Sequence, residues 1–228
     1  FVDLGASLPT PCRLSLQLYQ EGAPLLVWGT GCKLFNPNGT TPLTTNNYYY
    51  SLTRLKASGF LMIGAKKLKV TGLTWMDHEW GVLSPVGTPP IWVLQDMQLS
   101  NGVHLMNSTN AGIKPKENVK MKSTATVLWP DGTSTWVDSV TIPLKSPFIR
   151  EEKVGISEKK VEYYLQYKVD IDSSELKASF LVKSLMPDQL FIDSGLGLPD
   201  VYEGVASCEG EINNNAVTGT AWIEQSLG

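Results

Sequence analysis

The chain has few of the residues that bind metals or form disulfide frameworks. It contains two histidines and three cysteines among 228 residues. His78 and His104 are far apart in sequence and form no His-Glu-x-x-His pattern, so the sequence argues against a zinc site. Cys12, Cys32 and Cys208 lack metal-ligand spacing, and their odd number excludes a complete disulfide framework. The sequence favours three buried thiols and leaves a Cys12–Cys32 bridge as the alternative.

Charged residues are also scarce. They make up 18% of the chain, with a formal net charge of −3 and no run of Lys or Arg. Nucleic-acid binding needs such a basic patch, so we expect no nucleic-acid partner. No apolar run approaches the ~20 residues that span a bilayer, so we expect no membrane partner either. The first residues, 1–5, show no basic and apolar pattern of a signal peptide.

Alternation of apolar and polar residues is the main pattern present, and it predicts an all-β protein. Residues 13–19 and 163–171 alternate most clearly, whereas 1–12 read as irregular, and no helix longer than a turn or two is expected. In the first third the expected strands are 13–19, 25–28, 33–35, 48–55, 59–64 and 68–75. In the remainder they are 91–99, 103–109, 120–129, 133–142, 161–171, 176–184, 202–211 and 216–224.

The Pro- and Gly-rich stretch 84–90 predicts a linker between two units. The eight strands expected in 91–228 favour a lipocalin-like antiparallel β-barrel, with a β-sandwich as the alternative. The unit 1–83 has too few strands to close a comparable barrel. We therefore expect an incomplete β unit, part of a larger domain that a further polypeptide or a missing N-terminal segment completes.

The stretch from Trp75 to Gly81, Trp-Met-Asp-His-Glu-Trp-Gly, holds the densest set of chemically able groups in the chain. Because strand side chains alternate, Asp77 and Glu79 should share one face, and His78 and Trp80 the other. A histidine flanked by carboxylates can be held charged or fixed in one tautomer. Aromatic packing around a satisfied polar corner is the alternative, and the residues alone do not decide between the two.

The first hairpin of the second unit predicts a polar pair on an apolar wall. If its strands pair across the short connecting turn, Met97 faces Leu105 and Gln95 faces Asn107 inside the barrel. Buried amides need partners, so the two amides bond each other, which is favoured, or bond a ligand. His104 falls on the opposite face, where we expect a solvated surface histidine.

Several segments resemble one known family, the carotenoid hydratase (CrtC)/AttH-like lipocalins. They are 48–55 (Tyr-Tyr-Tyr-Ser-Leu-Thr-Arg-Leu), 59–61 (Gly-Phe-Leu), 70–81 with the Trp-Met-Asp-His-Glu-Trp-Gly string, 201–205 (Val-Tyr-Glu-Gly-Val) and 219–225 (Gly-Thr-Ala-Trp-Ile-Glu-Gln). Within that family the chain is most similar to the fungal decalin-forming Diels–Alderases.

That resemblance implies a pericyclase that folds a linear polyenoyl tetramic acid and catalyses its intramolecular [4+2] cycloaddition to a decalin, without a cofactor. The partner implied is this small-molecule polyene from a polyketide–nonribosomal peptide pathway. Catalysis would come from restricting conformers and from a hydrogen bond to a conjugated carbonyl. The expected site is a cleft between the units, with Trp75 and Trp80 as aromatic walls. Its catalytic residues would be Trp80, His78, Asn107 and Gln95, and its substrate-binding residues Trp75, Tyr50, Trp92, Met97 and Leu105.

Two other functions stay open. The carotenoid hydratases carry a Tyr-x-Asp that aligns with Leu105-Met106-Asn107 here, and an Asn is no carboxylic acid. A hydratase or isomerase of a polyene or terpenoid would then need Asp77, His78 or Glu79 as its acid. A non-catalytic carrier of an apolar ligand is the third hypothesis.

Overall fold

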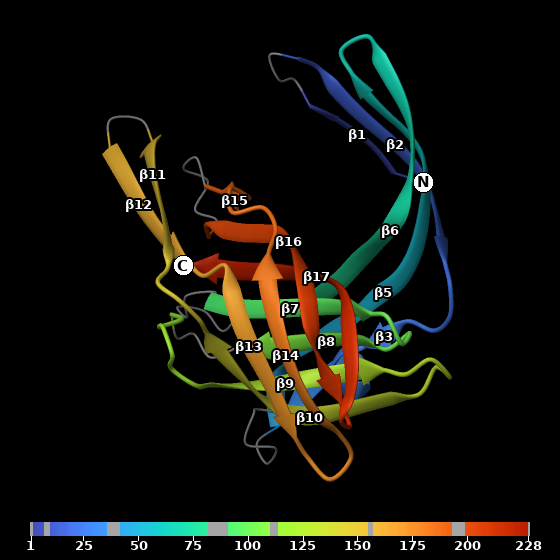
Figure 1. Cartoon of the computed structure of the whole chain (residues 1–228), viewed down its shortest axis with the longest axis vertical. Helices are drawn as coiled ribbons and strands as arrows, with labels where there is room; N and C mark the ends of the chain where they lie inside the picture. The colour runs from blue at the N-terminus through green and yellow to red at the C-terminus, as the bar shows by residue number, and fades with distance from the viewer. Residues whose placement is uncertain are drawn as a thin grey trace.

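A computed structural model shows an all-β protein, as the alternation predicts (Figure 1). It describes residues 2–6, 10–35, 42–81, 91–109, 114–154, 157–192 and 199–227. The strands of the first part are β1 (Val2–Ala6), β2 (Cys12–Gln20), β3 (Leu25–Leu26), β4 (Cys32–Phe35), β5 (Pro42–Ile63) and β6 (Lys66–Gly81), with a short 3-10 turn η1 (Val27–Gly29). Those of the second part are β7 (Ile91–Leu99), β8 (His104–Thr109), β9 (Met121–Leu128), β10 (Ser134–Pro143), β11 (Phe148–Val154), β12 (Ser157–Tyr163), β13 (Gln166–Asp172), β14 (Lys177–Ser184), β15 (Leu190–Phe191), β16 (Val201–Ile212) and β17 (Asn215–Leu227). No helix in these ranges is long and apolar enough to cross a membrane.

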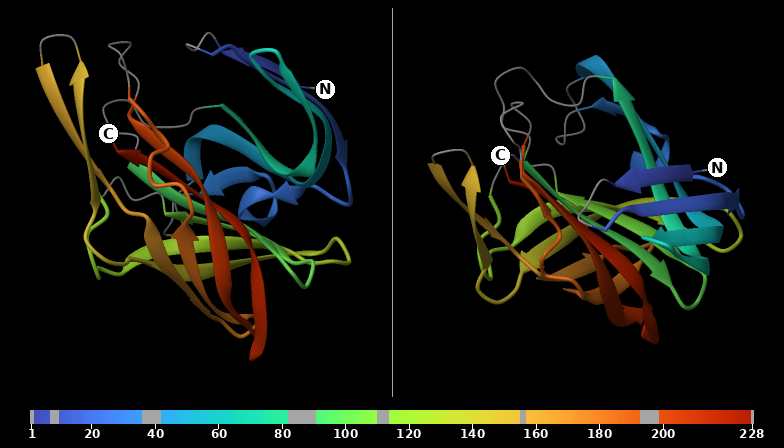
Figure 2. Two further views of the ribbon diagram at one scale, coloured as in Figure 1. Left: turned by 45° about the horizontal axis from the view of Figure 1, so that its top comes forward. Right: turned by 90° about the horizontal axis from the view of Figure 1, so that it is seen from above.

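The second part forms a closed antiparallel barrel of the lipocalin type (Figure 2). Its strands follow the order β14-β13-β10-β9-β8-β7-β17-β16, and pairing of β14 with β16 closes the ring. The strand expected over 161–171 is two strands instead. It breaks at Tyr164 and Leu165, because β12 leaves the barrel to pair with β11 in a separate hairpin.

Apolar side chains from alternate positions fill the barrel, because every second residue of a strand points inward. Met97, Leu105 and Tyr167 are fully buried there. Gly210 lets β16 approach β14 closely, since a Cβ at this position would lie 2.1 Å from the carbonyl oxygen of Ser179. Met97, Leu105 and Tyr167 belong to one hydrophobic cluster, so the interior is a packed core where they lie rather than an open cup.

The first part is a six-stranded sheet built on one long strand, β5. β5 runs unbroken for 22 residues where two strands were expected, and its partner β6 has 16. Gly59, which looked like a strand start, lies within β5, where a Cβ would meet the Ser15 carbonyl oxygen of β2 at 2.0 Å. The expectation that residues 1–12 are irregular is wrong, because Val2–Ala6 pairs with β2.

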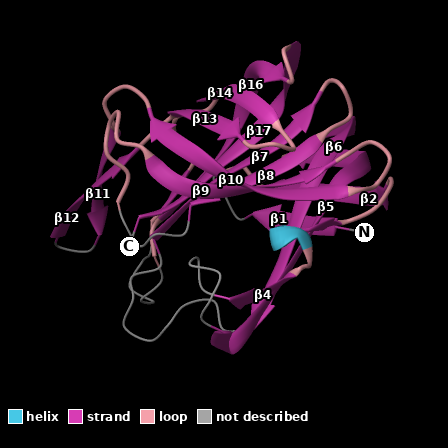
Figure 3. Ribbon diagram, turned by 90° about the horizontal axis from the view of Figure 1, so that it is seen from below, coloured by secondary structure: helices cyan, strands magenta, loops and turns pink. Residues whose placement is uncertain are grey.

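A small apolar cluster joins the sheet to the outer wall of the barrel. The turn η1, drawn in cyan in Figure 3, lies beside strands β9 and β10 at this contact. Trp28 of η1 and Tyr49 of β5 pack against Met106 and Leu128 of the barrel, and Trp75 lies beside them. Beyond this cluster, the Gln98 side chain donates to the Thr53 carbonyl oxygen at 2.7 Å. The expected linker 84–90 lies outside the described residues, so the division at 83 and 91 stays a prediction.

Candidate functional site at the contact between sheet and barrel

The Trp75–Gly81 motif forms the last part of β6, and its side chains point to two sides of the sheet. As the strand period predicts, Asp77 and Glu79 share one side, which faces the barrel and which we call the barrel-facing side. There the Asn47 amide donates to Glu79 at 2.7 Å. His78 and Trp80 lie on the other side, the far side, with their partners across β5.

Asp77 accepts three side-chain hydrogen bonds on the barrel-facing side. Its carboxylate accepts hydrogen bonds from the Ser51 hydroxyl at 2.6 Å, the Tyr49 hydroxyl at 2.8 Å and the Trp75 indole at 2.7 Å. Ser51 lies directly opposite Asp77 on β5, which explains the short contact. Three donors of this kind favour the ionised carboxylate and hold it in one orientation.

Three carboxyl groups of the barrel lie close enough to Asp77 for their charges to interact. They are Asp96 of β7, Glu203 of β16 and Glu224 of β17. Glu203 and Glu224 stand directly opposite each other across the β16–β17 pair, and the Trp92 indole donates to Glu224 at 2.5 Å. We call Asp77, Asp96, Glu203 and Glu224 the acidic cluster.

Burial is the main cause that raises the pKa of each member of the acidic cluster. The pKa of Glu224 rises to about 7, since burial and the charges of Glu203 and Asp77 outweigh its bond from Trp92. Burial and the neighbouring carboxylates raise the pKa of Asp96 well above its usual range. The pKa of Asp77 is raised by burial, and its three hydrogen bonds oppose the rise. The cluster thus holds a carboxyl group, Glu224, that exchanges a proton near neutral pH.

His104 is buried at this contact, so the expectation of a solvated surface histidine is wrong. It is 7% exposed and stacks on Trp75, with ring centroids 6.4 Å apart. Burial, followed by the charge of Arg54, lowers its pKa to about 4. The reason is that the outer face of β7 and β8 meets the N-terminal sheet instead of solvent. Asp96 and Gln98, on the same face, are buried for the same reason.

The predicted residues Tyr50, His78 and Trp80 come together on the far side of β5 and β6, with Tyr48. The Tyr48 and Trp80 rings stack at 5.3 Å, as do the Tyr50 and His78 rings. Trp80 also meets His78 edge-on at 5.1 Å and remains 45% exposed. We call these four residues the aromatic cluster.

The structure separates the two tryptophans that were expected to wall one cleft. Trp75 is five residues before Trp80 on a regular strand, so the two point to opposite sides. Trp75 contacts Asp77 and His104, whereas Trp80 belongs to the aromatic cluster. Trp92 joins Trp75 at the acidic cluster. The predicted aromatic residues and His78 therefore divide between two places on either side of one sheet.

Gln95, Asn107, Met97 and Leu105 lie inside the barrel, in the register that the hairpin predicts. Asn107 donates to Gln95 at 2.6 Å and to Thr141 at 2.8 Å, and all three are fully buried. The mutual bond is the favoured alternative of the two given above. The catalytic and substrate-binding roles of these four residues stay predictions, and in this structure their side chains belong to the packed interior.

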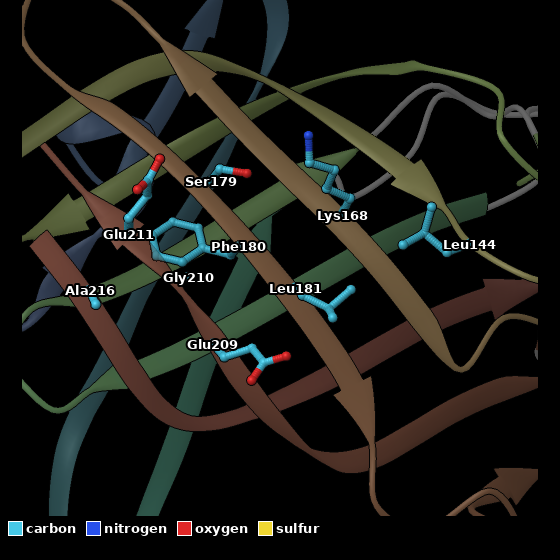
Figure 4. Close-up of a pocket in the computed structure, with 9 residues that line it drawn as sticks. All are labelled: Leu144, Lys168, Ser179, Phe180, Leu181, Glu209, Gly210, Glu211 and Ala216. Atoms are coloured by element: carbon cyan, nitrogen blue, oxygen red, sulfur yellow. The ribbon is translucent and has the colours of Figure 1, made fainter. Parts of the chain in front are cut away.

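An open groove of about 440 Å³ lies elsewhere, on the outward side of the barrel (Figure 4). It is lined by Leu144, Lys168, Ser179, Phe180, Leu181, Glu209, Gly210, Glu211 and Ala216. None of the predicted site residues lines it. Lys168 in its wall is paired with Asp170 at 2.9 Å.

Metal and disulfide chemistry find no support in the part of the chain that the structure describes. There, no three His, Cys, Asp or Glu side chains are arranged to hold a metal ion. Cys12, Cys32 and Cys208 are free thiols, of which only Cys208 is buried. The Cys12–Cys32 bridge considered above is therefore not formed.

The sequence interpretation did not single out Tyr49, Asp96, Glu203 or Glu224. All but Asp96 lie in segments that carry the family resemblance: Tyr49 in 48–55, Glu203 in 201–205 and Glu224 in 219–225. Asp96 stands out only because it is charged, whereas the remaining residues of β7 are apolar or glutamine. Their meeting depends on contacts between distant strands, which alternation along a single strand does not reveal.

Comparisons with known proteins agree with this fold. The sequence matches the AttH-like family model over residues 7–226, and a search of curated proteins finds no match. Kievitone hydratase from Nectria haematococca superimposes with a TM-score of 0.73 at 18% identity, covering 99% of this chain. An AttH protein from Nitrosomonas europaea superimposes with a TM-score of 0.71 at 19% identity, covering 97% of this chain. The chain spans only 64% and 63% of the lengths of those two proteins. It belongs to the AttH-like family.

Proposed function

We propose that the acidic cluster is the active site of a hydratase or isomerase that transfers a proton to a carbon–carbon double bond of an apolar substrate. The observation that carries this proposal is Glu224, whose pKa of about 7 suits a group that both gives and takes a proton at neutral pH. Its side chain is half-buried on the barrel wall, beside the indole of Trp92. The similarity to kievitone hydratase is consistent with this reaction class.

In the first step, protonated Glu224 gives its proton to one alkene carbon, and the π-electron pair forms the new C–H bond. Positive charge develops on the other carbon. Asp77 is suited to stabilise it, because three hydrogen bonds hold its carboxylate in place before the reaction begins. The indoles of Trp75 and Trp92 add electron-rich faces beside the same carboxylates.

In the second step, the positive carbon is quenched. In a hydratase, a water oxygen forms the new C–O bond and the proton that the water loses passes to the Glu224 carboxylate. In an isomerase, a proton leaves the adjacent carbon for the same carboxylate, and a new double bond forms. Either route restores protonated Glu224, so no cofactor is needed for balance.

Product analysis tests this proposal. The protein is incubated separately with kievitone and with a linear polyenoyl tetramic acid, and the products are separated by chromatography and weighed by mass spectrometry. A product heavier by one water, or an isobaric product with a shifted double bond, is expected from the acidic cluster. Substrate recovered unchanged but bound to the protein would favour the carrier hypothesis.

Glu224→Gln should lower turnover at least ~100-fold, because an amide cannot give the proton. Glu209→Gln is the matched control, since Glu209 is also on the β16–β17 hairpin but lines the outer groove. Equal activity in the two variants would contradict the role of Glu224.

We propose intramolecular [4+2] cycloaddition of a polyenoyl tetramic acid to a decalin as the second candidate. The aromatic cluster favours it, because Tyr48, Tyr50, His78 and Trp80 present stacked rings on which a flexible polyene can fold. This reaction gives an isobaric product whose formation Glu224→Gln leaves intact. Trp80→Ala should slow it at least ~10-fold, with Trp136→Ala, an exposed tryptophan of β10, as the control.

A further inference from the structure

The free edge of β6 is a conspicuous unpaired feature of the fold. β6 pairs with β5 along one edge for nearly its whole length. Along its other edge, no strand from the described part of the chain pairs with it. Residues at both ends of β6, 66–67 and 77–81, are exposed. A long edge of unpaired N–H and C=O groups is a template for pairing with another strand.

The charges on β6 are arranged to complement a second copy of the same strand. Lys67 and Lys69 lie near its start, and Asp77 and Glu79 near its end, with Leu73 midway. All five are odd-numbered, so they share the barrel-facing side of the strand. In an antiparallel pair centred on Leu73, Lys67 of each copy stands opposite Glu79 of the other, and Lys69 opposite Asp77.

The far side of β6 is compatible with the same pairing. There Leu68 would stand opposite His78, and Val70 opposite Met76, which places apolar and aromatic side chains next to one another. Leu73 itself is 57% exposed and would meet its own counterpart. A slip by one residue would put the lysines and the carboxylates on opposite sides, so the charges specify the register.

The acidic cluster adds an independent reason. In the part of the chain that the structure describes, no lysine or arginine is among the groups that set the pKa values of Asp77, Asp96, Glu203 and Glu224. Carboxylates that gather without a cation repel one another. Lysines on an edge strand commonly prevent it from pairing with another strand. They do not prevent pairing with a strand that carries carboxylates at the facing positions, because opposite charges attract.

We propose that two copies of this chain pair antiparallel through their β6 edges, about a two-fold axis at Leu73. Each copy then supplies Lys67 and Lys69 to the Glu79 and Asp77 of the other. The pairing joins the two six-stranded sheets into one continuous sheet. It does not depend on which reaction the protein catalyses.

Oligomeric mass and charge exchange test the proposal. Light scattering after size-exclusion chromatography should give twice the 25.0 kDa of one chain. Lys67→Glu and Glu79→Lys should each reduce the mass to that of one chain, and the double variant should restore the dimer. Circular dichroism of each variant checks that the β fold persists. A monomeric wild type, or a dimer that both single variants leave intact, would overturn the proposal and assign the edge to a strand of another polypeptide or to no partner.

Cross-linking locates the axis. Leu73→Cys should form a disulfide between copies in the oxidised protein, because directly opposed strand residues bring their Cβ atoms within ~5.5 Å. Lys56→Cys is the control, since Lys56 is exposed on β5 directly opposite Leu73, one strand in from the free edge of β6. Cross-linking of both variants alike, or of neither, would contradict a two-fold axis at Leu73.

Discussion

Replacing Trp92 by Phe should raise the pKa of Glu224, and the size of the rise follows from one hydrogen bond. The Trp92 indole donates to the Glu224 carboxylate at 2.5 Å and favours its ionised form. A hydrogen bond to a charged group is worth ~1.5–3 kcal/mol. One pKa unit corresponds to ~1.4 kcal/mol, so loss of the bond shifts the pKa by about 1–2 units. Because Glu224 is only half-buried, solvent replaces part of the bond, and we expect a rise of about one unit.

The assay is a carboxyl titration by carbon-13 NMR of protein labelled at glutamate. The Glu224 signal is identified by its absence in Glu224→Gln. Its midpoint should lie near pH 7 in the wild type and about one unit higher in Trp92→Phe. Trp136→Phe, a change at an exposed tryptophan, should leave the midpoint in place. An unchanged or lower midpoint in Trp92→Phe would refute the effect of this bond, and a wild-type midpoint near 4.5 would refute Glu224 as the neutral-pH acid.

Three further predictions concern stability. The folded protein holds the pKa of His104 at about 4, below the ~6.5 of an unfolded histidine, so stability is lost as pH falls from 6.5 towards 4. Between pH 6.5 and 4, the free energy of unfolding in urea should fall by up to about 3 kcal/mol more in the wild type than in His104→Gln. The same pH dependence in both proteins would refute the assignment. Asn107→Leu should cost about 3 kcal/mol in urea unfolding, because its buried polar partners lose their hydrogen bonds, and a neutral effect would mean that they find others. Gly210→Ala should cost about 3 kcal/mol or more because of the 2.1 Å approach to Ser179, whereas Gly72→Ala, with open space around it, should be near neutral; similar melting temperatures for the two would contradict the packing argument.

The barrel could be predicted from the sequence because its strands are short, alternate regularly and are connected by recognisable turns. The pairing of Gln95 with Asn107 followed from one turn and the period of two. Asn213 and Asn214, in the turn between β16 and β17, have the positive φ angles that a two-residue hairpin needs. Local chemistry decides such features, so local sequence reveals them.

The acidic cluster could not be predicted in the same way. The alternation that places Met97 inside the barrel places Asp96 and His104 outside, and a polar outer face normally meets solvent. Here a second sheet covers the outer face, and no sequence pattern within β7 or β8 predicts that contact. The two tryptophans are a different case. Trp75 and Trp80 are five residues apart, so the period of two already places them on opposite sides of β6, and the single cleft expected between them conflicts with that period.

The most direct test of proton transfer is the position of deuterium in a product made in D2O. Wild-type protein should give a product with one deuterium bound to carbon, which remains after exchange back into H2O, and Glu224→Gln should form this product at least ~100-fold more slowly. A product without carbon-bound deuterium, formed equally fast by the wild type and Glu224→Gln, would contradict proton transfer by the acidic cluster and support cycloaddition at the aromatic cluster.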